Sequence, residues 1–181
     1  MKSSRELKKN KVGCTDGALD FVETLLDWSH ARGISVLIDI HGVMGSQNPF
    51  DNSGRTQGLK WTSKLTTEPS GLVTFEHWPI QTAGWMGEFN RKTYTYDKIN
   101  YQQIQRTLDV IQIIVDTYKY HPAVLGLEPV NEPWWFTPID ELKKFYWEGY
   151  LIVKKAAPYW KFIIHDSFRF NPSTWKGFMK G

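Results

Sequence analysis

The chain has 181 residues, of which 41% are apolar and 23% are charged, so it has the composition of a folded protein and not of a disordered one. The net charge is +3, and the basic clusters lie near the chain ends instead of forming the dense stripe of a nucleic-acid-binding protein. A single cysteine, Cys14, excludes an internal disulfide and a multi-cysteine zinc site.

Membrane-spanning and secretory segments are not predicted. No apolar run approaches the roughly 20 residues that cross a bilayer. The basic N-terminus is not followed by the apolar core of a signal peptide, so the sequence as it stands reads as cytosolic. The unusual feature of the composition is an aromatic content of 15%.

Three segments have apolar residues at helical spacing. In chain order, the predicted helices span 17–32, 104–120 and 138–157. Asp16 and Thr137 are the predicted N-terminal caps of the first and the third helix. Gly33, Pro122 and Pro158 are the residues expected to end the three helices.

Each predicted helix is followed by a short and nearly continuous apolar run. These runs span 35–41, 123–130 and 161–165. Continuous apolar runs suit parallel strands that are covered on both faces, and the alternation of helix and strand is typical of an α/β fold. No strand opens into the G-x-G-x-x-G of a Rossmann fold, so we predict a (β/α)8 TIM barrel. The connection from 42 to 97 shows no clear periodicity.

Polar residues follow all three predicted strands, where a barrel has its active face. Glu132 is the candidate catalytic residue, because a carboxyl group beside indole rings is partly desolvated, which favours the protonated form that a general acid needs. The alternative is a surface glutamate in a salt bridge. For His41 the alternative is a structural histidine, and for His165 and Asp166 structural hydrogen bonding is the expected role.

Two segments resemble a known family. Residues 39–54, Asp-Ile-His-Gly-Val-Met-Gly-Ser-Gln-Asn-Pro-Phe-Asp-Asn-Ser-Gly, are followed by Gly-Leu-Glu-Pro-Val-Asn-Glu-Pro at 126–133. Together they resemble glycoside hydrolase family 5, and within it the exo-β-1,3-glucanases (glucan 1,3-beta-glucosidases) of fungi and oomycetes. The resemblance implies a (β/α)8 barrel that hydrolyses β-1,3-glucan with retention of configuration. It implies no metal or organic cofactor.

The resemblance also implies a role for individual residues. Glu132 matches the acid/base, and Asn131 matches the residue that contacts the sugar 2-hydroxyl. His41 matches a substrate-binding histidine after the third strand, and Phe50 an aromatic residue at the entrance of the glucan site. The sequence departs from the family pattern at Pro49, where glycine is common.

Tryptophans are candidate platforms for the apolar faces of sugars. We expect this role for Trp134 or Trp135, which directly follow the acid/base candidate. We expect Trp28 and Trp147, both on predicted helices, to pack in the core. Three further candidate platforms in the long connection are Trp61, Trp78 and Trp85.

The resemblance predicts that residues 1–181 are a partial family 5 catalytic domain, covering about strands 3 to 5. A retaining glycosidase needs two carboxyl groups about 5–5.5 Å apart. Glu128 precedes Glu132 by four strand positions, which is roughly 13 Å, so it does not suit the second role. The resemblance places the nucleophile on the seventh strand, and we therefore expect the isolated chain to be inactive.

Two alternatives remain open at this stage. The chain could be a non-catalytic glucan-binding relic, or part of a family 5 endo-β-1,4-glucanase. In each case the expected partner is a β-glucan polysaccharide or oligosaccharide, with no nucleic acid and no membrane. The family resemblance implies an extracellular or cell-wall location for the full-length protein.

Overall fold

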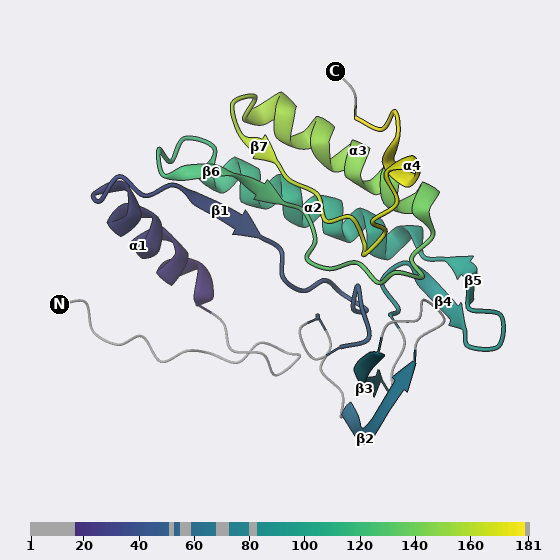
Figure 1. Cartoon of the computed structure of the whole chain (residues 1–181). Coiled ribbons are helices and arrows are strands. Elements are labelled where there is room, and N and C mark those ends of the chain that lie inside the picture. The colour runs from purple at the N-terminus through teal and green to yellow at the C-terminus, as the bar shows by residue number, and fades with distance from the viewer. Residues whose placement is uncertain (1–16, 51–52, 55–58, 68–72, 80–82, 180–181) are drawn as a thin grey trace.

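A three-stranded parallel sheet lies at the centre of the molecule (Figure 1). The structure is a computed structural model, which describes residues 17–50, 53–54, 59–67, 73–79 and 83–179. In spatial order the strands are β1 (Val36–Asp39), β6 (Val124–Glu128) and β7 (Lys161–Phe162). Each strand lies beside the next strand of this sheet along the chain, as in the wall of a (β/α)8 barrel. All three are shorter than the predicted runs.

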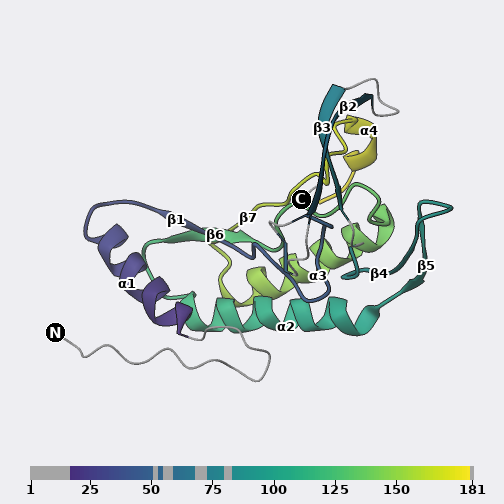
Figure 2. The same cartoon turned by 90° about the horizontal axis from the view of Figure 1, so that it is seen from below.

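Helices connect the three strands. α1 (Ala18–His30) precedes β1, α2 (Tyr101–Tyr118) precedes β6, α3 (Ile139–Ala156) precedes β7, and the short α4 (Pro172–Trp175) comes last. Figures 1 and 2 show α2 and α3 on the same side of the sheet. Helices on one side suit a barrel, whereas a doubly wound sheet carries them on both sides. The predicted α/β class is confirmed. Within the described part of the chain, no helix is long and apolar enough to span a membrane.

The connection from 42 to 97 contains two antiparallel hairpins that the sequence did not predict. Their strands are β2 (Leu59–Thr67) with β3 (Val73–Pro79), and β4 (Gly87–Asn90) with β5 (Thr95–Ile99). Each hairpin has an irregularity in its register. A bulge interrupts the two-residue alternation by which a strand is recognised, so these strands carry a weak signal in the sequence.

The starts of two helices differ from the prediction. Asn100 caps α2, and its Oδ1 accepts a hydrogen bond from the Gln103 N–H at 3.2 Å. α3 begins after Pro138, whose backbone is extended (φ −57°, ψ 120°), and no side chain caps this helix. The predicted cap at Thr137 is therefore wrong, because the extended ψ of Pro138 keeps this proline out of the helix, so that Pro138 and not Thr137 flanks the first helical residue. The predicted cap at Asp16 lies outside the described residues.

The core lies between the sheet and the inner faces of α2 and α3. Its buried side chains include Ile111, Val115, Leu127, Leu142, Phe145 and Val153. β6 and β7 approach closely at Gly126, where an added Cβ would lie 2.1 Å from the carbonyl oxygen of Lys161. Glycine at this position is therefore required for the pairing of the two strands.

Two tryptophans that were expected in the core are exposed. Trp28 is 63% exposed and Trp147 is 46% exposed. Each lies two positions after a fully buried residue of its helix, Leu26 and Phe145 respectively. Two positions correspond to a rotation of roughly 200° about the helix axis, so these indoles point away from the core.

Candidate active site

The carboxyl ends of β1 and β6 meet at one edge of the sheet. Asp39 and Glu128 are partners in the parallel register. The pairing continues past the strand ends, because the Ile40 N–H donates to the Glu128 carbonyl and the Asn131 N–H donates to the Ile40 carbonyl, both at 3.1 Å. The predicted site residues that follow these two strands are therefore brought to one edge of the sheet.

Glu132 has an unusual backbone conformation. Its φ is +45°, in the left-handed region that few residues other than glycine adopt. Such a conformation persists where the surrounding structure fixes it, and it is common at functional sites. The residue is half-buried. Beside it, Asn131 Nδ2 is buried and has no hydrogen-bond partner among the described residues, so it remains available as a donor to a bound molecule.

The loop after β1 holds the backbone on both sides of Glu132. Gln47 Nε2 donates to the carbonyl oxygens of Asn131 and His41, both at 2.9 Å. Asn48 Nδ2 donates to the carbonyl oxygen of Glu132 at 2.9 Å. Both amide side chains are buried. No role was predicted for either residue, although both belong to the motif that carries the family resemblance.

The loop after β7 holds the backbone of the residues that follow Glu132. Ser167 Oγ is buried and lies 2.9 Å from the carbonyl oxygens of both Pro133 and Trp134. The Arg169 guanidinium donates to Ser167 Oγ at 3.1 Å and also to the carbonyl oxygen of Trp135. Burial lowers the pKa of Arg169. The segment 131–135 is thus bonded to the loops of both neighbouring strands. Neither Ser167 nor Arg169 was predicted.

His41 and Asp39 form a close pair at the same edge. His41 Nδ1 lies 2.7 Å from Asp39 Oδ2, and the side chain of His41 is 63% exposed. The pairing engages Nδ1 and fixes the ring orientation. Binding of a sugar hydroxyl by the other ring nitrogen, Nε2, stays a prediction.

Negative charge accumulates around Glu128. Burial is the main cause that raises the pKa of this carboxyl group, and the charges of Asp39 and Glu132 raise it further, while His41 lowers it. These electrostatic effects show that the side chains after β1 and β6 act on one another.

Aromatic side chains pack beside the acid/base candidate. The Trp134 ring centroid lies 4.5 Å from that of Phe89 in β4 and 5.0 Å from that of Phe136. Trp135 is 39% exposed. Phe50 is partly exposed, and its N–H donates to Asn48 Oδ1 at 3.0 Å. Sugar binding by Phe50, Trp134 or Trp135 stays a prediction.

Trp85 does not belong to the site. It is fully buried, its ring packs edge-on at 4.9 Å from Phe145, and its Nε1–H donates to Thr107 Oγ1 at 3.0 Å. The suggestion that it stacks on sugar is therefore wrong, because α2 and α3 enclose it. The side chains of Trp61 and Trp78 lie outside the described part of the structure.

His165 and Asp166 make the local hydrogen bonds that were expected of them. His165 Nδ1 accepts from the Ser167 N–H at 2.9 Å, and Asp166 Oδ1 accepts from the Phe168 N–H at 2.8 Å. Both bonds shape the loop that carries Ser167.

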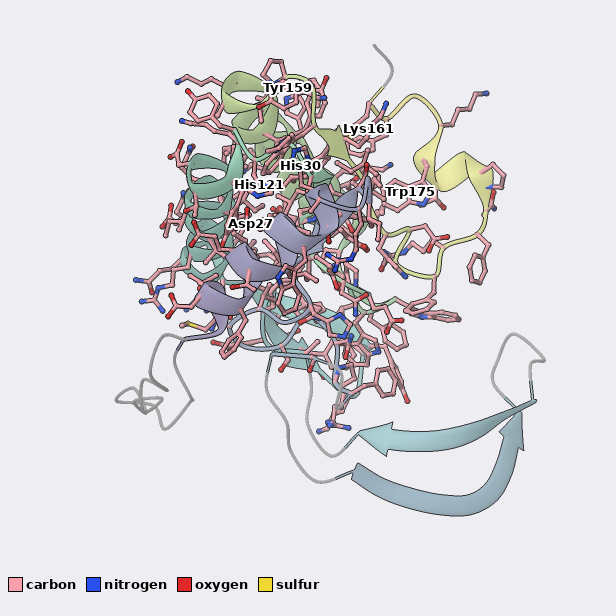
Figure 3. The ribbon with its side chains drawn as sticks, turned by 90° about the vertical axis from the view of Figure 1, so that its left-hand side faces the viewer. Asp27, His30, His121, Tyr159, Lys161 and Trp175 are labelled. Carbon is pink, nitrogen blue, oxygen red and sulfur yellow. The ribbon has the colours of Figure 1, made fainter. Side chains whose placement is uncertain are left out.

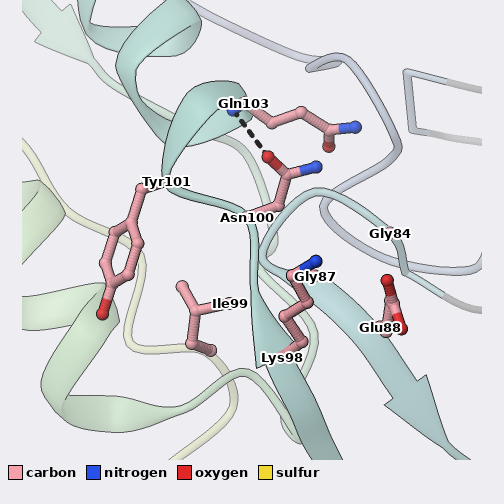
Figure 4. A pocket seen from close by; sticks show the side chains of 8 residues that line it. All are labelled: Gly84, Gly87, Glu88, Lys98, Ile99, Asn100, Tyr101 and Gln103. Atoms are coloured by element: carbon pink, nitrogen blue, oxygen red, sulfur yellow. Dashed lines mark hydrogen bonds between the residues drawn. The ribbon is translucent and has the colours of Figure 1, made fainter.

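A pocket lies between the β4–β5 hairpin and the start of α2 (Figure 4). Its volume is about 350 Å³, and its lining includes Glu88, Lys98 and Gln103 but none of the predicted site residues. Among the residues that the structure describes, no cluster of three or more His, Cys, Asp or Glu side chains is arranged to hold a metal ion.

Comparison with known proteins identifies a class of relatives. No family model matches the chain. Over about 90% of its length, however, the chain is similar to fungal proteins named glucan 1,3-beta-glucosidase, which confirms the resemblance inferred from the two motifs.

Individual relatives show how far the similarity extends. The chain is 30% identical over 165 residues to the glucan 1,3-beta-glucosidase of Blumeria graminis, covering 90% of this chain and 30% of the relative. It is 28% identical over 169 residues to a probable glucan 1,3-beta-glucosidase A of Aspergillus terreus. This alignment covers 91% of this chain and 31% of the relative. The chain thus spans about 30% of the length of these curated relatives. The solved structure of endo-glycoceramidase II from Rhodococcus, bound to a cellobiose-like imidazole, aligns with 84% of this chain and 36% of that chain, with a TM-score of 0.49 and 16% identity.

Proposed function

We propose that residues 1–181 form the central part of a glycoside hydrolase domain, covering about strands 3 to 5 of a (β/α)8 barrel, whose substrate is β-1,3-glucan. The order β1-β6-β7 and the helices on one side of the sheet support the architecture. The names of the relatives support the substrate class. An extracellular or cell-wall location forms part of the same proposal.

The observation that carries the proposal is the placement of Glu132 at the edge of the sheet that also carries Asn131 and His41, in a backbone fixed by two neighbouring loops. In the proposed double displacement, the Glu132 carboxyl group protonates the glycosidic oxygen as the bond to the anomeric carbon breaks. A second carboxylate attacks that carbon and forms the glycosyl-enzyme. Glu132 then removes a proton from water, which releases the sugar with its configuration retained.

Two side chains have supporting roles in this mechanism. The buried Nδ2 of Asn131 donates to the sugar 2-hydroxyl and so gains the partner that it lacks among the described residues. His41, oriented by Asp39, binds a further hydroxyl through Nε2. We propose that the nucleophile lies outside residues 1–181, so that the chain alone binds glucan without cleaving it.

Calorimetric titration of the 181-residue chain with laminaritriose and with cellotriose tests the substrate class. We expect binding that favours laminaritriose, that is weakened at least fivefold by Trp135→Ala, and that persists in Glu132→Gln. The matched control is Trp147→Ala, which removes a similarly exposed indole from α3. A preference for cellotriose would indicate a β-1,4-glucanase, and no binding of either sugar would contradict the proposal.

Incubation of the chain with laminarin tests the location of the nucleophile. We expect no release of glucose. Release that Glu132→Gln abolishes would show that both carboxyl groups lie within residues 1–181.

A further inference from the structure

The backbone torsion of Glu132 is the starting point. The torsion angle φ describes rotation about the bond between the backbone nitrogen and Cα of a residue, and in Glu132 it is +45°. This torsion sets the position of the Asn131 carbonyl group relative to the Glu132 carbonyl group. It also sets the direction in which the Glu132 side chain leaves the backbone. A change from left-handed to extended geometry would redirect the carboxyl group.

Two adjacent side chains bond to the two carbonyl groups that this torsion relates. Gln47 Nε2 donates to the Asn131 oxygen and Asn48 Nδ2 to the Glu132 oxygen, each at 2.9 Å. The partners are 84 residues apart in the sequence, so the contact joins the loop after β1 to the loop after β6. A rotation of φ would break at least one of these two hydrogen bonds.

Backbone hydrogen bonds fix the orientation of the Gln47 and Asn48 side-chain amide groups. Gln47 Oε1 accepts from the Val43 N–H at 3.2 Å, and Asn48 Oδ1 accepts from the Phe50 N–H at 3.0 Å. Each amide therefore has a backbone donor at its oxygen and a backbone acceptor at its nitrogen, and a flipped amide would lose both contacts. The side chains of Gln47 and Asn48 are 0% and 1% exposed, so water does not compete for these bonds.

We propose that Gln47 and Asn48 are positioning residues, which hold Glu132 in left-handed geometry and thereby aim its carboxyl group into the site. The consequence for catalysis rests on the proposed function, but the positioning itself does not. Neither amide needs to touch the substrate. Ser167 bonds to the next two carbonyl groups, those of Pro133 and Trp134, and so limits the movement of the segment that follows.

NMR of the isotope-labelled chain without sugar tests the positioning. Gln47→Met and Asn48→Leu keep the approximate volume and remove the donors. We expect the Glu132 13Cα shift and its HN–Hα coupling to move from left-handed towards extended values. Left-handed values retained in both variants would overturn the proposal.

The matched control is Thr107→Val, which removes two other hydrogen bonds of a buried side chain, the one from the Trp85 indole and the one to the Gln103 carbonyl. It is expected to lower stability while leaving the Glu132 resonances unchanged. If the variants fail to fold, hydrogen exchange in the unmodified chain tests the positioning proposal instead. Slow exchange of the Gln47 and Asn48 side-chain amide protons is expected, and exchange at the rate of an exposed amide would overturn the proposal.

These readouts separate the two proposals. Glu132 resonances that respond to the variants in a chain that binds no laminaritriose would support the positioning and contradict the glucanase function. Laminaritriose binding with unresponsive Glu132 resonances would support the function and contradict the positioning.

Discussion

At the scale of single residues, Glu128 has an ionisation that is coupled to folding. Burial and neighbouring negative charge raise its pKa above the ordinary value of 4.5 in the folded chain. The folded state therefore binds this proton more tightly than the unfolded state does. It follows that the free energy of unfolding falls as the pH rises from about 4.5 through the raised pKa, and that the loss persists at neutral pH.

We predict that Glu128→Gln removes this pH-dependent loss. At pH 7 the variant should have a higher urea midpoint than the unmodified chain, and the difference should disappear below about pH 4, where glutamate is itself neutral. Urea denaturation at several pH values measures this. As a control, Glu88→Gln removes an exposed carboxyl group of β4 away from this edge. A variant that is less stable than the parent at pH 7 would contradict the prediction.

The Ser167 hydroxyl group is a second single group that we expect to contribute to the free energy of unfolding. We predict that Ser167→Ala lowers the free energy of unfolding by about 1–3 kcal/mol, because it removes the hydroxyl group that donates to the buried Pro133 carbonyl. Chemical denaturation gives the value. The exposed Ser173→Ala should change it by less than about 0.5 kcal/mol. Equal effects of the two substitutions would show that the buried hydroxyl contributes nothing specific.

At the scale of elements, α2 connects the two strands that carry the site. Its start is defined by Asn100, which accepts a hydrogen bond from the Gln103 N–H. Its buried residues include Ile104, Leu108, Ile111, Val115 and Tyr118, and their spacing of three and four positions is the periodicity from which the helix was predicted. The cap was not predicted, because one polar residue before a periodic segment is a weak signal.

We predict that Asn100→Ala lowers the free energy of unfolding by about 1 kcal/mol, because the Gln103 N–H in the first turn loses its side-chain acceptor. Asn100→Asp keeps an acceptor at this position and should retain most of the stability. Thermal or urea denaturation of the two variants distinguishes them. A loss of the same size in both would mean that the amide group, and not capping, matters here.

At the scale of the whole molecule, α1 is joined to the rest less firmly than α2 and α3 are. Leu26 is buried, and His121 Nε2 lies 3.2 Å from Asp27 Oδ1 (Figure 3). α1 also carries large apolar side chains that are exposed. Its exposed residues are Leu19, Phe21, Leu25 and Trp28, at 51% to 67% exposure. Exposed apolar surface of this extent stabilises the helix little against unfolding.

We predict that the isolated chain unfolds with low cooperativity and that α1 opens first. Amide protons of α1 should exchange at least tenfold faster than those of the buried face of α2, and the thermal transition should be broad. Hydrogen exchange and calorimetry measure these quantities. A sharp transition, with equal calorimetric and van't Hoff enthalpies, would contradict the prediction.

Local patterns in the sequence predicted much of the framework. The periodicity of three helices, the apolar runs between them and the polar residues after each run indicated a parallel α/β sheet with a site at its carboxyl edge. These features are local, because burial of one helix face or of a short strand selects residue types at fixed spacing. The two hairpins were not predicted, because irregularities in their register disturb that spacing.

The tertiary structure decided how the site is held. The left-handed backbone of Glu132, the hydrogen bonds from Gln47 and Asn48, and the buried place of Trp85 depend on contacts between distant parts of the chain. Periodicity by itself determined the class of fold and the place of the site after the strands, whereas the roles of Asn131, His41 and Phe50 were expected from the family resemblance. The conformation of those residues depends on long-range hydrogen bonds and packing, which no local spacing encodes.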